Sequence, residues 1–174
     1  MVYSAEELLI ERENRVQRQN TLMQRYNLPL LFIKVNYPGI NKNNTLSENI
    51  FNIIYDYALV LTDSIIQIKE TRITAEGPTA TLIIREDPIY IKKISVIVED
   101  EHLLGRCVDI DVYNNITNFS ISRKQLGMQP RKCFVCDEMA QICARTQTHE
   151  ISQIIKYLKE SLEKFMENSY EKKV

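Results

Sequence analysis

The sequence has no long apolar run and no surplus of either charge, and each absence excludes a class of protein. No segment approaches the roughly 18 consecutive apolar residues that a membrane-spanning helix needs. The formal net charge is −1, whereas broad, non-specific nucleic-acid binding needs a basic surplus. We therefore expect no membrane and no nucleic acid among its partners. The near-neutral total charge is nevertheless compatible with a local basic pocket.

Signals for export are also missing. The first residues do not combine a cationic start with a following apolar stretch, which is the pattern of a secretory signal. All four cysteines fall between positions 107 and 143, an uneven distribution for a disulfide framework. We expect reduced cysteines and a cytoplasmic protein.

The length and composition predict one soluble domain over residues 1–174. A chain of 174 residues with 44% hydrophobic residues can bury a core that needs no disulfide or metal to hold it. No internal repeat and no low-complexity linker divides the sequence. The hydrophobic spacing indicates an α+β fold.

The predicted core is a ferredoxin-like βαββαβ-type antiparallel arrangement. An N-terminal helix begins at Ser4, where Glu7 completes a capping box. From Asp87-Pro88 to about Val98 the residues fit a helix, although Ile94, Val96 and Val98 would also fit a strand, and the Asp87-Pro88 start favours the helix. The other predicted elements are a helix at 45–62, strands at 28–35, 65–74, 79–84, 108–112 and 119–122, and two C-terminal helices at 132–145 and 148–170.

Asp109 and Asp111 are the most informative pair of polar residues. They alternate with valine and isoleucine between Val108 and Val112, so a strand here would point both carboxylates to one face. Two neighbouring carboxylates repel each other unless a cation lies between them, and Mg²⁺ is the usual one. The alternative is a strand with two solvated acids on its open face.

Basic residues follow this strand closely. Arg123, Arg131, Lys132 and Arg145 lie within 23 positions of one another, and arginine binds phosphate oxygens in pairs. Upstream, Arg12 and Arg15 are neighbours on the first helix, and Lys42 follows a Pro-Gly turn. Each of these residues is either part of a solvated surface or a phosphate ligand. His149 either caps a loop or donates to phosphate.

Three of the four cysteines, together with one histidine, resemble a set of zinc ligands. Cys133, Cys136, Cys143 and His149 would supply three thiolates and one imidazole. If residues 132–145 form one helix, however, Cys136 and Cys143 lie about 10 Å apart along its axis, which is too far for one zinc ion. We therefore expect the cysteines to pack as small hydrophobic residues, with zinc and a redox pair as less favoured alternatives.

Several uncommon blocks occur in one order: His102-Leu-Leu-Gly-Arg106, Asp109-Ile-Asp111, Ser122-Arg123, Pro130-Arg-Lys-Cys-x-x-Cys136 and Cys143-Ala-Arg145-x-x-x-His149. Together they resemble the citrate lyase holo-[acyl-carrier protein] synthase family, the apo-citrate lyase phosphoribosyl-dephospho-CoA transferases. The chain departs from that pattern at Leu103, where proline is common, and at Cys107, which is often aliphatic.

The resemblance implies a nucleotidyltransferase. Such an enzyme moves a phosphoribosyl-dephospho-CoA group from 2′-(5″-triphosphoribosyl)-3′-dephospho-CoA to a serine of the citrate lyase acyl-carrier subunit and releases pyrophosphate. The rivals are the matching transferase for the malonate decarboxylase carrier and a non-catalytic, zinc-containing module that docks a carrier.

The implied roles follow from this reaction. Asp109 and Asp111 would hold Mg²⁺, with Glu99 as a weaker third ligand. His102 would accept the serine proton. The substrate phosphates would be bound by Arg12, Arg15, Lys42, Arg106, Arg123, Arg131, Arg145 and His149.

Overall fold

The computed structural model describes residues 3–171, which form five α-helices and a four-stranded antiparallel sheet. In chain order the elements are α1 (Ala5–Tyr26), β1 (Leu30–Val35), α2 (Thr45–Thr62), β2 (Ile66–Thr74), β3 (Gly77–Ile84), α3 (Pro88–Glu101), β4 (Val108–Tyr113), α4 (Ala140–Thr146) and α5 (Ile151–Glu171). No helix within 3–171 is both long and apolar enough to cross a lipid bilayer.

The sheet has the topology that the sequence predicts. Its strand order is β2-β3-β1-β4, and every neighbouring pair is antiparallel. The succession β1-α2-β2-β3-α3-β4 in this order is the ferredoxin-like arrangement. The expected α+β fold, with an added N-terminal helix and two C-terminal helices, is confirmed.

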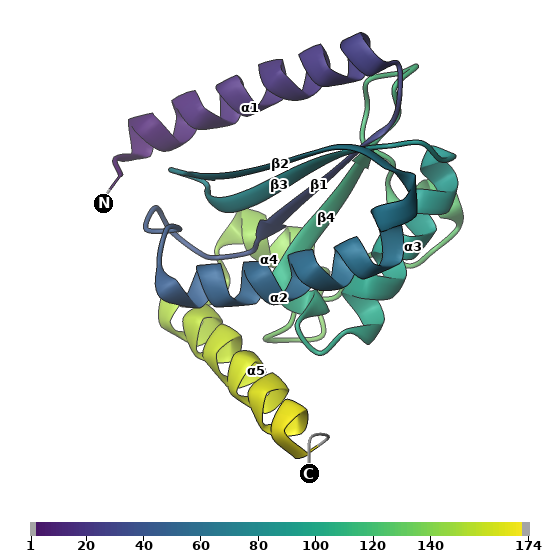
Figure 1. Ribbon diagram of the computed structural model, residues 1–174. Coiled ribbons are helices and arrows are strands. Elements are labelled where there is room, and N and C mark those ends of the chain that lie inside the picture. Colours follow the sequence, from purple (N-terminus) through teal and green to yellow (C-terminus); the bar gives the residue numbers. More distant parts are fainter. Residues whose placement is uncertain (1–2, 172–174) are drawn as a thin grey trace.

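The main core lies on the side of the sheet that α2 and α3 cover (Figure 1). Because side chains alternate along a strand, every second residue of three strands faces these helices. The sheet side of this core consists of Leu31, Ile33, Val35, Ala80, Leu82, Ile84, Val108, Ile110 and Val112. Leu158 of α5 is fully buried in the same core.

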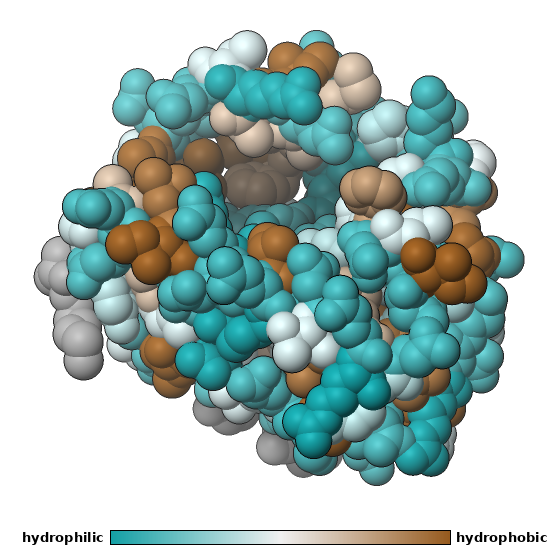
Figure 2. Space-filling model, turned by 90° about the horizontal axis from the view of Figure 1, so that it is seen from above, coloured by the Kyte–Doolittle hydropathy of each residue, from teal (hydrophilic) through white to brown (hydrophobic). Residues whose placement is uncertain are grey.

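Among the helices of residues 3–171, only α1 crosses the opposite face of the sheet (Figure 1). A smaller cluster holds the helix there, formed by Met23 with Leu30, Phe32 and Ile83. The N-terminus of α1 has the predicted capping box between Ser4 and Glu7. Figure 2, which looks onto this side, shows a hollow with hydrophobic residues inside it and both hydrophobic and hydrophilic residues on its rim.

β4 lies at one edge of the sheet, and α3 supplies the hydrogen bonds that a further strand would provide. Lys92 Nζ donates to the Ile110 carbonyl at 3.0 Å, and the Ile110 N–H donates to Glu99 Oε1 at 2.9 Å. Lys92 and Glu99 are 5% and 3% exposed, so both charged groups are buried. They satisfy backbone groups that would otherwise be open at the edge.

Two predicted elements are wrong. Residues 132–145 are not one helix, because Lys132 and Met139 form an antiparallel bridge and α4 begins only at Ala140. Residues 119–122 do not form a strand, although Tyr113 pairs with Ser120 in an isolated bridge. In both segments, backbone groups form hydrogen bonds across a turn instead of the predicted helix or strand.

Gly105 is required where the chain passes the end of α3. A Cβ atom at this position would overlap the Val98 carbonyl oxygen and would lie 2.7 Å from that of Glu99. We expect Gly105→Ala to lower the free energy of unfolding by about 3 kcal/mol, because neither backbone group can move freely. Urea denaturation measures this change.

The matched control is Gly127→Ala. Gly127 has φ +69°, but apart from its chain neighbours no atom of residues 3–171 lies within 4 Å of an added Cβ, so its cost is the backbone strain of about 1 kcal/mol. Equal losses in the two variants would contradict the close packing assigned to Gly105.

Candidate active site

The two aspartates of β4 lie side by side on the face that α1 crosses. In the pairing with β1, Asp109 is opposite Lys34 and Asp111 is opposite Phe32. Lys34 Nζ is 3.6 Å from Asp109 Oδ2, and Asn36 Nδ2 donates to Asp109 Oδ1 at 3.0 Å. The strand alternation therefore puts both carboxylates on the polar face of the sheet, as the sequence predicts.

Arg131 reaches this pair from the segment beyond β4. Its guanidinium donates to Asp109 Oδ1 at 2.8 Å and to the Val108 carbonyl at 3.1 Å. The same group forms an ion pair with Glu99. Arg131 therefore joins α3 to the first of the two aspartates.

Asp111 is in a different electrostatic position. Within residues 3–171 it has no ion-pair partner, whereas Asp109 has Lys34 and Arg131. Burial raises the pKa of Asp111, and the neighbouring Asp109 carboxylate raises it further. A cation between the two carboxylates would relieve both effects, and carboxylate oxygens are ligands that Mg²⁺ prefers. The donor set fits this ion.

A group of basic residues lies at the β2–β3 turn. Arg15 Nε is 2.7 Å from Glu76 Oε2, and Arg12 Nε is 3.8 Å from Glu76 Oε1. The guanidinium of Arg15 also covers the ring of Phe32, 4.7 Å from its centroid. Burial, followed by the charges of Arg12 and Lys34, lowers the pKa of Lys42 to about 8. The predicted residues Arg12, Arg15 and Lys42 are thus brought together.

Another group of basic residues lines a depression of about 460 Å³ between α3 and residues 123–132. Arg106, Arg123 and Arg131 all contribute to its wall. Arg123 is held by Glu99 at 2.7 Å and by both oxygens of Asp100 at 2.8 Å. Arg106 donates to the Lys132 carbonyl. Arg145, in contrast, is exposed on α4 and does not join the depression.

Glu99 and His102 lie away from the open face of the aspartate pair. Both oxygens of Glu99 are bonded, one to Ile110 N–H and one to Arg123. The His102 ring lies against Tyr57 and Phe165, and its Nδ1 accepts from Leu104 N–H at 3.0 Å. Burial lowers its pKa. The ring is on the α2 and α5 side of the sheet.

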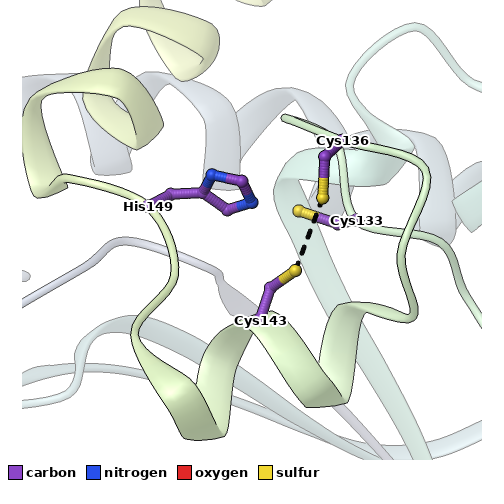
Figure 3. Close-up of side chains that lie close together, drawn as sticks. All are labelled: Cys133, Cys136, Cys143 and His149. Carbon is purple, nitrogen blue, oxygen red and sulfur yellow. Dashed lines mark hydrogen bonds between the residues drawn. The ribbon is translucent and has the colours of Figure 1, made fainter.

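His149 lies with the cysteines instead of the arginines. Ligand atoms of Cys133, Cys136, Cys143 and His149 are all within 4.8 Å of one another. Figure 3 shows the imidazole turned toward the three sulfur atoms. The distance argument against a shared metal was wrong, because it assumed the helix that the Lys132–Met139 bridge replaces.

Three contributors to these groups were missed in the sequence. Lys34 is the one charged residue in the apolar run Leu30–Val35, and that exception was the available signal. Asn36 follows the same strand, and its backbone N–H donates to the Cys107 carbonyl. Glu76 lies between two predicted strands, and an acid in a hairpin turn gives no sign that it will be buried against Arg15 of α1.

Residues 3–165 match the sequence model of a family described as apo-citrate lyase phosphoribosyl-dephospho-CoA transferase. Relatives of that name from Escherichia coli O1:K1 / APEC and from E. coli strain SMS-3-5 / SECEC are 32% identical over 155 residues, 87% of this chain and 84% of each relative. One from Shigella boydii serotype 18 has the same identity and coverage. The matched range contains both groups of basic residues and the aspartate pair.

The raised pKa of Asp111 predicts how its substitution changes stability with pH. A group whose pKa is raised by folding contributes stability at pH values below its ordinary pKa, which is 3.8 for this carboxyl. That contribution is lost as the pH rises through the pKa that the group has in the folded protein. Asp111→Asn keeps the side chain neutral. We expect its Tm to exceed that of the original protein near about pH 7, and the gap to shrink toward about pH 4.

Asp109→Asn is the matched control. It removes a charge that Lys34 and Arg131 contact, so the free energy of unfolding should fall by about 1 kcal/mol at neutral pH. If Asp111→Asn destabilised the protein as much as Asp109→Asn, the difference between the two environments would be refuted.

Proposed function

The chain belongs to the apo-citrate lyase phosphoribosyl-dephospho-CoA transferase family, and from this premise we propose that it attaches the 2′-(5″-phosphoribosyl)-3′-dephospho-CoA group to a serine of the citrate lyase acyl-carrier subunit. It is a transferase of that family. The match over residues 3–165 carries the proposal. The paired carboxylates with basic groups on both sides support it, because such sites handle phosphates.

The proposed reaction is a displacement at phosphorus. The serine oxygen of the carrier attacks the phosphorus nearest the ribose of 2′-(5″-triphosphoribosyl)-3′-dephospho-CoA and forms a new P–O bond. The P–O bond to the outer two phosphates breaks, and pyrophosphate leaves with that electron pair. The serine proton passes to solvent. His102 has no role in this proposal, because the core of the sheet separates it from the aspartates.

Asp109 and Asp111 are proposed to hold Mg²⁺, which supplies charge neutralisation at the phosphates when bound. Lys34 and Lys42 orient the triphosphate from the β1 side. Arg12 and Arg15 bind it from α1. Arg106, Arg123 and Arg131 bind phosphate from the β4 edge. Glu99 acts by positioning Arg131, because both its oxygens are already bonded. Arg145 and His149 lie outside these groups.

The mass of the carrier tests the reaction directly. Apo carrier subunit, the triphosphate precursor, Mg²⁺ and the protein are mixed, and the carrier should gain the mass of the phosphoribosyl-dephospho-CoA group. EDTA should abolish the gain. Asp109→Asn and Asp111→Asn should each lower the rate more than about 100-fold, since even outer-shell partners of metal ligands reach that range. Asp56→Asn, on the exposed surface of α2, is the control.

Two outcomes would overturn the proposal. An unmodified carrier that a known synthase can still modify would exclude the citrate lyase reaction. A gain only on the malonate decarboxylase carrier would assign the chain to that rival substrate. Retention of full activity in Asp109→Asn would refute the metal role separately from the reaction.

We expect the pKa of Lys42 to determine the alkaline limb of the pH profile of kcat/KM. Its pKa of about 8 reflects burial and the nearby cations Arg12 and Lys34, opposed by Glu76 and Asp109. Only the protonated amine attracts phosphate, so kcat/KM should fall as pH rises through about 8. Lys42→Arg should keep its charge and move this limb to higher pH. A limb that stays in place in Lys42→Arg would show that another group causes it.

A further inference from the structure

The segment between the β4 edge and α5 brings together three cysteines and a histidine that the proposed reaction does not use. Cys133 and Cys136 lie in the turn closed by the Lys132–Met139 bridge, Cys143 lies on α4, and His149 precedes α5. Gln147, with φ 49°, turns the chain after α4, and Thr148 N–H donates to the Cys143 carbonyl at 3.2 Å. These contacts return His149 to the sulfurs.

We propose that Cys133, Cys136, Cys143 and His149 form a structural Zn²⁺ site. Their ligand atoms lie within 4.8 Å of one another, and Cys136 Sγ is 3.5 Å from Cys143 Sγ. In a tetrahedral site with Zn–S bonds of about 2.3 Å, the sulfurs are about 3.8 Å apart. The four side chains therefore need only small shifts to bind one ion.

His149 supplies a second, independent observation. Its Nε2 is buried, and within residues 3–171 it has no hydrogen-bond partner. A buried polar atom without a partner is uncommon in a native protein. Figure 3 shows the ring directed at the sulfurs, so a metal ion would give this nitrogen the ligand role that the protein alone does not provide.

The backbone around Cys133 is also arranged for a thiolate. Val135 N–H donates to Cys133 Sγ at 3.4 Å, and Cys133 N–H donates to the Glu138 carbonyl at 2.7 Å. Three thiolates with one imidazole select zinc among the common protein metals, whereas Mg²⁺ prefers oxygen. Four protein ligands leave no open position for water, so this site is structural and separate from the aspartate pair.

The zinc site has a consequence for Arg131, and this link rests on the proposed function. Arg131 is two residues before Cys133 and contacts Asp109 and Glu99. The next carbonyl, of Lys132, accepts from Arg106, and the Phe134 ring stacks on Tyr157 of α5 at 4.5 Å. An ordered metal turn holds this segment between β4 and α5, and thereby positions Arg131.

Metal content tests the site without any assay of activity. The full chain, free of any affinity tag and purified without added metal, should contain about one zinc per chain by mass spectrometry. Cys143→Ser and Cys136→Ser should lose it; Cys136 is the most exposed of the four cysteines, so this variant should still fold. Cys107→Ala, which changes the one cysteine outside the cluster, should keep it. Cobalt substituted for zinc should show the absorption of a tetrahedral thiolate site.

Two results would overturn the zinc site. Zinc below about one-tenth per chain with four titratable thiols would show that the cysteines only pack. Absence of zinc with two thiols missing from the titration would show a disulfide.

The positioning link has its own readout. Cys136→Ser and Arg131→Ala should lower kcat for carrier modification by similar factors, and the double variant should lose little more, because both act through one contact. Additive losses would refute the link while zinc binding stands. Zinc in a protein that modifies no carrier would refute the proposed function while the site stands.

Discussion

The buried carboxylate of Glu99 is the interaction on which the β4 edge depends. It accepts the Ile110 N–H and forms ion pairs with Arg123 and Arg131. A buried carboxylate without such partners would destabilise the fold by several kcal/mol, so the two arginines are bound to this position. Since Ile110 lies between Asp109 and Asp111, the contacts that neutralise Glu99 also fix the backbone carrying the aspartate pair.

One face of β4 contributes to stability, and the other carries the residues proposed for the chemistry. Val108, Ile110 and Val112 are buried in the main core, which supplies apolar burial independently of the other face. That other face can then hold two neighbouring carboxylates, one of which has a raised pKa. Sites that bind charged substrates commonly reduce stability in this way, and the rest of the fold compensates for it.

The sequence predicted what depends on local pattern. Strand alternation put Asp109 and Asp111 on one face, the capping box began α1 at Ser4, and the order of elements predicted the ferredoxin-like core. It failed at 132–145, where α4 begins only at Ala140 and the residues before it form a bridged turn. That segment is held by contacts with distant residues, such as Phe134 with Tyr157 and Lys132 with Arg106, and no local pattern indicates them.

Closeness in sequence grouped Arg123, Arg131 and Lys132, which line one depression, but it failed for Arg145. The positions of the arginines depend on their acidic partners. Arg15 is bound to Glu76, Arg123 to Glu99 and Asp100, and Arg131 to Asp109 and Glu99. This matching explains how a chain with net charge −1 concentrates cations near the β2–β3 turn and beside α3. An incoming polyphosphate must compete with carboxylates for these arginines.

Two lysines can meet an anion without breaking a short ion pair. Lys34 is 3.6 Å from Asp109, and within residues 3–171 the Nζ of Lys42 contacts only the Tyr37 carbonyl. The lysines are therefore the cations best placed for first contact with phosphate, and the arginines follow only as their carboxylates are released.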